Sequence, residues 1–231
     1  MKKATVEAVK SGRLSEADID KSVKRILKIA QRTFLHKKAA FNAEEHNYLA
    51  LKVAEQGAVL LKNEGRLLPV KEDDIVLIGY MAKHFRYQGS GSSHINPTML
   101  TSLTDALPNV KYIECCNADG EVTEAQLKAA AKTAKNAKVA VVVAGLPDIY
   151  ESEAIDRASM DLPTGHNRMI ETVANANPNT VVILLGGSAM ELPWIDRVKA
   201  VLYMGLSGQA GGLLKMANGH FMKGIIKMIK N

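Results

Sequence analysis

The sequence contains few of the residues that build disulfide scaffolds, metal sites or membrane segments. Cysteine occurs only twice, as the neighbours Cys115 and Cys116. Because neighbouring residues of a strand point to opposite faces, we expect no disulfide between these two. No spacing of cysteine and histidine is typical of a metal site, so we expect no bound metal. The longest apolar runs are far shorter than a membrane span, so we expect no membrane partner.

Concentrated positive charge is also missing. The formal net charge of +6 comes largely from lysines that are spread along helical faces and at both termini. No dense Lys/Arg block is interleaved with aromatic residues, so we expect no nucleic-acid partner. No apolar stretch follows Lys2 and Lys3, and we therefore expect no signal peptide and a cytoplasmic protein. The 231 residues suit one globular domain with an extra piece at an end.

Apolar runs rich in Val, Ile and Leu alternate with helical patterns over most of the chain. The runs that predict buried strands are 74–79, 110–114, 139–145, 180–186 and 199–203. The patterns that predict helices are 101–107, 123–138, 164–175 and 192–197. This alternation predicts an α/β fold, a three-layer sandwich in which helices cover both faces of a mostly parallel sheet.

The first 65 residues are predicted to be helical. Residues 1–40 contain a capping box and apolar positions at helical spacing, but no strand. A second helix begins after Asn42 and continues through the apolar stretch 58–61 to Gly65. We therefore expect a helical remnant of another domain in 1–40 and an α/β sandwich domain in 41–212. A divergent basic tail, a candidate for a short closing helix, follows in 213–231.

A charged cluster follows the predicted strand 139–145. Within residues 150–157 lie Glu151, Glu153, Asp156 and Arg157. In an open parallel sheet, ligands bind beyond the carboxyl ends of the strands, so these side chains are candidates for a functional site. The alternative is a solvated loop whose charges pair with one another.

Two further loops follow predicted strands. The Gly-rich loop, residues 87–93, permits close approach of its backbone to a ligand. It lacks the Gly-Lys-Ser/Thr ending of a phosphate loop, the dinucleotide fingerprint and the spacing of a nucleophile elbow. The other loop, residues 186–188, is interpreted as a plain turn.

Several segments in series resemble the C-terminal α/β sandwich domain of glycoside hydrolase family 3, the β-glucosidase-like retaining enzymes. The resemblance covers about residues 5 to 212, and residues 14–27 are similar to the last helix of the family's barrel domain and the linker after it. The segments that carry it are Leu60-Leu-Lys-Asn63 with Leu68-Pro69, Gln88-Gly-Ser-Gly-Ser-Ser93 with Pro97, Gly145-Leu-Pro147, Glu151-Ser-Glu-Ala-Ile-Asp-Arg157 with Leu162-Pro163, and Pro193-Trp194 with Gly208-Gln-Ala-Gly-Gly212.

The resemblance implies hydrolysis of β-glucosides or related β-glycosides without a metal or organic cofactor. In this family an aspartate of a TIM barrel attacks the anomeric carbon, and a glutamate of the α/β domain protonates the leaving oxygen and then activates water. The position that matches this glutamate is Glu153, with Glu151 as its rival. The resemblance implies that Asp156 and Arg157 shape the loop, and we expect them to pair with each other. The substrate-binding candidates are Ser92, Ser93, Glu151, Asp156 and Arg157.

This sequence also departs from the family's usual pattern. Ala154 stands where the family usually has Gly, and His166 where it usually has Gln. The pattern is lost after Gly212. The sequence contains no barrel domain, so we expect the chain alone to be inactive and to expose apolar surface that favours homo-oligomers.

Two functions of other classes remain open on the sequence. One is a non-catalytic module that binds carbohydrate or docks a partner, having kept the fold without the barrel. The other is a nucleotide-binding α/β domain, which the ending of the Gly-rich loop disfavours.

Overall fold

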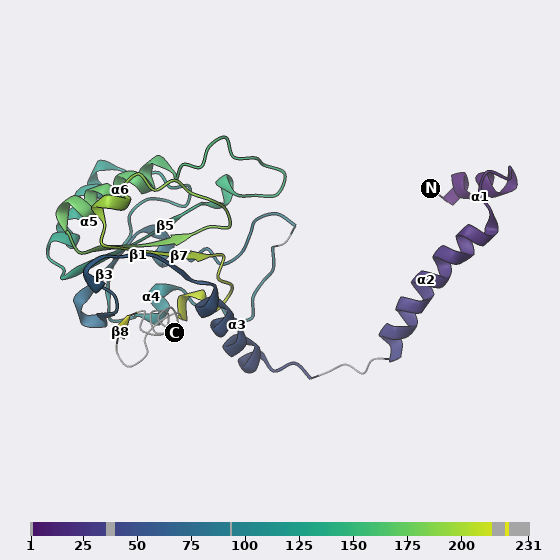
Figure 1. Cartoon of the computed structure of the whole chain (residues 1–231), viewed down its shortest axis with the longest axis horizontal. Coiled ribbons are helices and arrows are strands. Elements are labelled where there is room, and N and C mark those ends of the chain that lie inside the picture. Colours follow the sequence, from purple (N-terminus) through teal and green to yellow (C-terminus); the bar gives the residue numbers. More distant parts are fainter. Residues whose placement is uncertain (1, 36–39, 93, 214–219, 222–231) are drawn as a thin grey trace. The chain divides into compact units, whose positions relative to one another are not determined.

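The computed structural model describes residues 2–35, 40–92, 94–213 and 220–221. These residues belong to two compact units, Met1–Asn42 and Ala43–Asn231 (Figure 1). The first unit contains α1 (Lys2–Lys10) and α2 (Glu16–Leu35), and neither helix has a buried residue. Gly12, with a φ of +73°, lies in the turn between them. No helix among the described residues is both long and apolar enough to cross a bilayer.

The second unit contains the α/β domain. Its helices and strands are α3 (Ala43–Gly57), β1 (Val59–Asn63), β2 (Val70–Lys71), β3 (Ile75–Ile78), α4 (Leu103–Ala106), β4 (Lys111–Ile113), α5 (Glu124–Lys135), β5 (Val139–Gly145), α6 (Thr164–Ala176), β6 (Thr180–Leu185), β7 (Ala200–Gly205) and β8 (His220–Phe221). Single turns of 3₁₀ helix follow several strands, among them Tyr80–Ala82 and Asp148–Tyr150.

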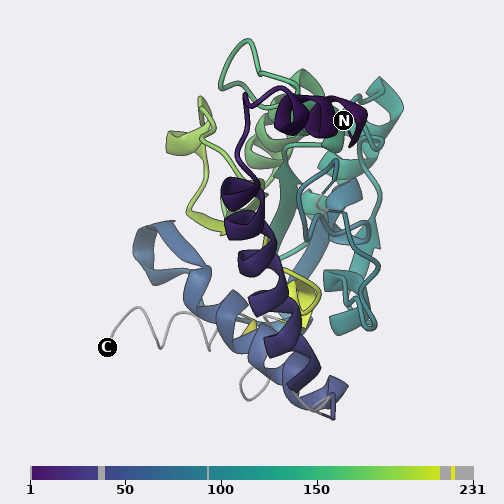
Figure 2. The ribbon, with the colours of Figure 1, turned by 90° about the vertical axis from the view of Figure 1, so that its right-hand side faces the viewer.

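The main sheet has the strand order β1-β7-β6-β5-β3-β4. The neighbouring strands from β7 to β4 all pair in parallel, and β1 pairs antiparallel with β7 at the edge. Helices α5 and α6 cover one face of the sheet, and α3 and α4 lie on the other (Figures 1 and 2). The predicted three-layer α/β sandwich with a mostly parallel sheet is confirmed.

The core divides into two apolar layers because strand residues alternate between the faces of the sheet. In β5, Val139, Val141 and Val143 pack into the layer that also holds Leu103 of α4. The alternate residues of β5 pack into the layer beneath α5 and α6. All seven residues of β5 are buried, and each fully buried valine contributes about 1.5–3 kcal/mol relative to exposure. The buried strand β5 therefore holds the start of the loop that follows it at the carboxyl edge of the sheet.

Two predicted elements differ from the structure, and the helix predicted at 192–197 is a single turn of 3₁₀ helix at Ile195–Arg197. The other difference is larger. The apolar stretch 58–61 was expected to continue a helix to Gly65, but α3 ends at Gly57 and β1 follows. Strand β1 pairs with β7, which satisfies backbone groups that would otherwise be unpaired at the edge of the sheet. A continuous apolar run has no period that separates helix from strand, so this tertiary pairing decided the outcome.

In the tail, for which a short closing helix was one candidate, His220–Phe221 forms strand β8, antiparallel to β2. Residues 214–219 and 222–231 lie outside the described residues. In contrast, the predicted start of α5 was correct, because Thr123 with Gln126 forms a capping box there. Helix α4 lies inside the predicted range 101–107 and is capped by Ser102 with Asp105, which the sequence interpretation did not identify.

Candidate active site

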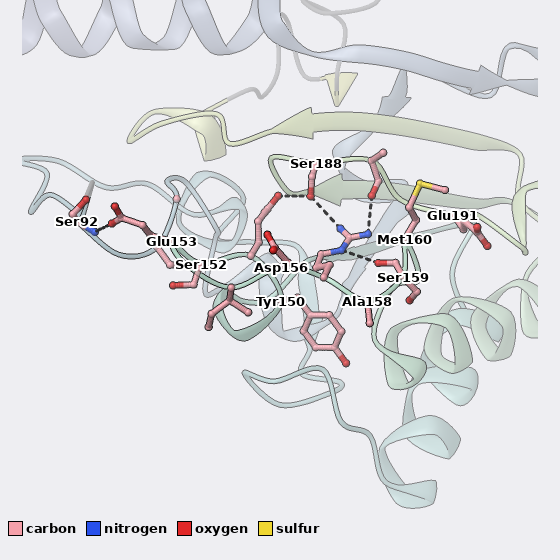
Figure 3. Close-up of a pocket in the computed structure, with 16 residues that line it drawn as sticks. Ser92, Tyr150, Ser152, Glu153, Asp156, Ala158, Ser159, Met160, Ser188 and Glu191 are labelled. Carbon is pink, nitrogen blue, oxygen red and sulfur yellow. Dashed lines mark hydrogen bonds between the residues drawn. The ribbon is translucent and has the colours of Figure 1, made fainter.

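Three loops meet beyond the carboxyl ends of β3, β5 and β6. They line a cleft of about 950 Å³ (Figure 3). This volume lies near the upper end of the range for small-molecule sites, about 300–1,000 Å³. Because ligands of open α/β sheets bind beyond the carboxyl ends of the strands, this cleft is the candidate active site.

The cleft brings together side chains that the sequence singled out from two separate loops. The predicted site residues that line it are Ser92, Glu151, Glu153, Asp156 and Arg157. Ser93 lies outside the described residues. Ser188, from the loop that was interpreted as a plain turn, also lines the cleft.

Glu153 is held by the Gly-rich loop. The backbone N–H of Ser92 donates a hydrogen bond of 2.8 Å to Oε2 of Glu153, and Ser90 forms an isolated parallel bridge with Ser152. Gly91, with a φ of +96°, makes this approach possible, because a Cβ atom there would lie 2.6 Å from Cβ of Glu153. The two loops therefore pack backbone against backbone at the point where Glu153 enters the cleft.

Glu151 makes contacts of a different kind. Its carboxylate accepts hydrogen bonds from the backbone N–H of Gly187 at 2.9 Å and from the hydroxyl of Ser188 at 2.6 Å. It also forms an ion pair of 2.9 Å with Nη1 of Arg86. The oxygens of Glu151 thus accept from three protein groups, and its predicted roles, a substrate contact or a rival acid/base, stay predictions.

Arg86 is the residue of this site that the sequence interpretation missed. Its side chain is 5% exposed. The guanidinium donates to the carbonyl oxygens of Leu146, of Pro147 at 3.3 Å and of Glu151 at 2.9 Å. The available signal was its place directly before the Gly-rich loop, beyond the end of a buried strand.

Arg157 anchors the other side of the same loop. Its guanidinium donates to the hydroxyl of Ser188 at 3.1 Å and to the carbonyl oxygens of Ser159 and Ala189 at 3.0 and 2.9 Å (Figure 3). The expected pairing with Asp156 is not among the ion pairs of the described residues; the side chain of Asp156 is exposed at the cleft.

Glu153 is ionised at neutral pH in this chain. Hydrogen bonds from the hydroxyl and then the backbone N–H of Ser92 lower the pKa of its carboxyl, and the side chain is exposed. A glutamate that acts as a general acid must hold its proton near neutral pH, which burial would favour, but the side chain of Glu153 is exposed in the described part of this chain. Within the part of the chain that is described, no three His, Cys, Asp or Glu side chains gather as metal ligands.

Comparison with known proteins identifies the family. Residues 58–216 match the model of the glycosyl hydrolase family 3 C-terminal domain. The chain belongs to glycosyl hydrolase family 3. It is 46% identical over 224 residues to thermostable β-glucosidase B of Acetivibrio thermocellus, a match that covers 92% of the chain and 30% of that protein. It is 34% identical to an exo-α-(1→6)-L-arabinopyranosidase of Bifidobacterium breve, over 90% of the chain and 30% of that protein.

Solved structures of β-glucosidases share the fold. The family 3 β-glucosidase of Bifidobacterium adolescentis superposes with a TM-score of 0.85 at 34% identity, over 93% of this chain and 33% of that one. A β-glucosidase of Listeria innocua in complex with isofagomine gives a TM-score of 0.79 at 22% identity, over 91% of this chain and 32% of that one. The chain thus spans about a third or less of the length of these relatives, and it corresponds to the family's C-terminal domain.

The departures from the usual family 3 pattern have structural counterparts. Ala154, which replaces the usual glycine, has a φ of +65°, in the left-handed region that glycine tolerates best. His166, which replaces the usual glutamine, is buried at the start of α6, and its Nδ1 lies 2.9 Å from the carbonyl oxygen of Gly145. Burial lowers the pKa of His166 to about 4. The neutral imidazole can therefore bond the carbonyl oxygen of Gly145 at the end of β5, where the loop that carries Glu153 begins.

Proposed function

We propose that this chain supplies the general acid/base carboxylate of a retaining β-glycosidase, and that Glu153 carries this role. The observation that carries the proposal is that Glu151 and Glu153 differ in their hydrogen-bond partners and in their exposure at the cleft. The carboxylate of Glu151 accepts from Arg86, Gly187 and Ser188, whereas Glu153 is exposed at the cleft and is bonded by Ser92. An acid/base group needs an oxygen that can reach substrate or water.

The proposed reaction has two steps. In the first, Glu153 donates a proton to the leaving oxygen while a carboxylate from another domain attacks the anomeric carbon and forms a glycosyl–enzyme ester. In the second, Glu153 removes a proton from the water that cleaves this ester. Retaining enzymes place the two carboxyl groups about 5–5.5 Å apart, so the nucleophile must enter the cleft from a domain that docks beside Glu153.

The surface around the cleft supports such docking. The loops after β3 and β5 carry large apolar side chains that are between 42% and 63% exposed: Ile95, Met99, Leu100, Ile149, Ile155 and Met160. A barrel domain that covers them would remove water from Glu153. Desolvation disfavours the charged form of a carboxyl group, so docking would raise the pKa of Glu153 and allow it to hold a proton.

The proposed substrate is a β-linked glucoside. Support comes from the relative with 46% identity, which is a β-glucosidase; the arabinopyranosidase relative shows that the sugar varies within the family. The sugar-selective residues of such a substrate site would belong largely to the docked domain.

Leaving-group dependence tests the proposal once the barrel domain is restored, in cis or as a separate chain. We expect Glu153→Gln to reduce turnover of alkyl glucosides and disaccharides by about 10²–10⁴-fold, the usual value of general acid catalysis. With dinitrophenyl glucoside, the rate of the first step, formation of the glycosyl–enzyme ester, should fall far less, because dinitrophenolate leaves without a proton. Equal losses on both substrate classes would contradict the role of Glu153.

One observation favours a second function, carbohydrate binding without catalysis. The pKa of Glu153 is lowered in the chain itself, and an ionised carboxylate accepts hydrogen bonds from sugar hydroxyls. Saturable binding of cellobiose by the chain alone, unchanged by addition of a barrel domain and without any hydrolysis by the pair, would favour this function.

A further inference from the structure

The loop that carries Glu153 is attached to its surroundings at three consecutive residues. Glu151 binds donors of the loops after β3 and β6, Ser152 forms the bridge with Ser90, and Glu153 accepts from Ser92. Only the last of these contacts involves the proposed acid/base itself. The first is the strongest, because it joins a carboxylate to a buried guanidinium and to two further donors.

We propose that Glu151 is a positioning residue that sets the place of Glu153 by joining Arg86 to the loop after β6. The inference rests on the proposed role of Glu153 as acid/base. Glu151 itself does not touch substrate or take part in proton transfer, which separates it from the rival role considered on the sequence.

The geometry of Arg86 explains why the negative charge of Glu151 is needed. The guanidinium is buried and already donates to three backbone carbonyl oxygens of the loop that carries Glu153, those of Leu146, Pro147 and Glu151. Carbonyl oxygens carry no net charge, so a carboxylate must balance the cation. The carboxylate of Asp148 lies 3.3 Å from Nε but is 71% exposed, whereas that of Glu151 is 19% exposed. Burial weakens solvent screening, so Glu151 provides most of this balance.

The contacts of Glu151 continue to the far side of the loop through Ser188. The hydroxyl of Ser188 donates to Glu151 at 2.6 Å and accepts from Arg157 at 3.1 Å (Figure 3). The chain Arg86–Glu151–Ser188–Arg157 therefore spans both ends of the segment in which Glu153 lies. Removing its central carboxylate separates the two anchors. The backbone around 152–153 then keeps the bridge with Ser90, the bond from Ser92, the turn bond from the N–H of Ile155 to the carbonyl of Ser152 and the bond from Arg86 to the carbonyl of Glu151, but loses its link to the loop after β6.

An amide in place of the carboxylate cannot reproduce these contacts. The oxygens of Glu151 accept from Arg86 on one side and from Gly187 and Ser188 on the other. A glutamine has one acceptor oxygen, and its NH₂ group would face donors on whichever side it occupies. Glu151→Gln thus keeps the shape of the side chain while it breaks the network.

The position of Glu153 can be read in this chain without any enzymatic activity. The Ser92 bond lowers the pKa of the Glu153 carboxyl, so a displaced Glu153 titrates closer to an ordinary glutamate. Carbon-detected NMR of the side-chain carboxyl gives this pKa, and the amide shift of Ser92 follows the same titration from the other partner of the bond.

The experiment compares the 231-residue chain with Glu151→Gln, Ser188→Ala and Asp148→Asn. We expect the pKa of Glu153 to rise in Glu151→Gln and the titration to disappear from the Ser92 amide. Ser188→Ala removes one contact at the exposed end of the network. It should raise the pKa of Glu153 and weaken the titration seen at the Ser92 amide, each by less than Glu151→Gln does. Asp148→Asn is the matched control: it removes a carboxylate from the same arginine but leaves the contacts to Gly187 and Ser188, and the titration of Glu153 should not change.

An unchanged titration of Glu153 in folded Glu151→Gln would overturn the proposal. If Glu151→Gln fails to fold, Ser188→Ala decides, and an unchanged titration there overturns it equally. These outcomes are independent of the proposed function, because they need neither a barrel domain nor a substrate. Conversely, the titration of Glu153 could shift in Glu151→Gln while Glu153→Gln leaves the activity of a barrel-containing enzyme unchanged. This outcome would support the positioning contacts and reject the acid/base role.

Discussion

Ala154 adopts a backbone conformation that an alanine side chain disfavours, in the middle of the loop that carries Glu153. The left-handed region costs a non-glycine residue about 1–2 kcal/mol. The resemblance to the family marked this position as a departure from glycine, but the value of φ could not be read from the sequence, because it depends on how the folded loop packs. The φ of +65° places Ala154 in this region, so the loop tolerates the strain.

Ala154→Gly should therefore stabilise the chain. We expect a gain of about 0.5–1 kcal/mol in the free energy of unfolding, since relief of the strained φ exceeds the added entropy of the unfolded glycine. Urea unfolding measures it. Ala158→Gly, in the same loop but without a positive φ, is the control and should be neutral or destabilising. A loss of stability in Ala154→Gly as large as in the control would contradict the strain.

His166 predicts a dependence of stability on pH. The folded pKa of about 4 lies below the ordinary value of 6.5, so the unfolded chain binds the proton first as pH falls. The contribution of the neutral imidazole is complete above pH 6.5 and is lost between pH 6.5 and about 4, amounting to about 3 kcal/mol. His166→Gln, the residue usual in the family, should remove this part of the slope. Parallel stability curves for both proteins across this window would show that His166 is not the cause.

At the scale of elements, the sequence predicted what local patterns determine and missed what distant contacts determine. The strands β5 and β6 and the capped helix α5 follow from apolar runs and capping residues alone. The edge strand β1 does not, because its partner β7 lies far along the chain. Likewise Glu153 was placed by its motif, whereas Arg86 gained its role only from folding against the loop after β5.

The Gly-rich loop provides a test of how closely two loops must approach. Gly91→Ala places a Cβ atom against Glu153 at a φ of +96°, whereas Gly208→Ala meets no atom within 4 Å at a φ of +71°. Both variants carry the cost of a left-handed alanine, about 1–2 kcal/mol, but only the first also has a clash. We expect Gly91→Ala to destabilise more and to raise the pKa of Glu153. Equal stability losses and an unchanged Glu153 titration would show that the close packing of the loops is not required.

For the molecule as a whole, exposed apolar side chains predict self-association. In the α/β domain, α3 and β1 expose Tyr48, Leu49, Val53, Val59 and Leu61, each at least 48% accessible. Contiguous apolar patches of more than a few hundred Å² are uncommon on soluble monomers. Sedimentation velocity should show mass that rises with protein concentration, and Leu49→Lys with Val53→Lys should reduce this rise. A monomer at every concentration would show that this surface is tolerated in water.

The role of Glu153 in the whole enzyme is tested most directly by azide rescue with the barrel domain restored. In Glu153→Gln, the glycosyl–enzyme ester formed from dinitrophenyl β-glucoside should accumulate, because no base activates water. Azide needs no base, so its addition should restore turnover and yield β-glucosyl azide, the same anomer as the substrate. Glu151→Gln should give no azide product. Rescue of Glu151→Gln in place of Glu153→Gln, or of neither variant, would contradict the assignment of Glu153 as the acid/base.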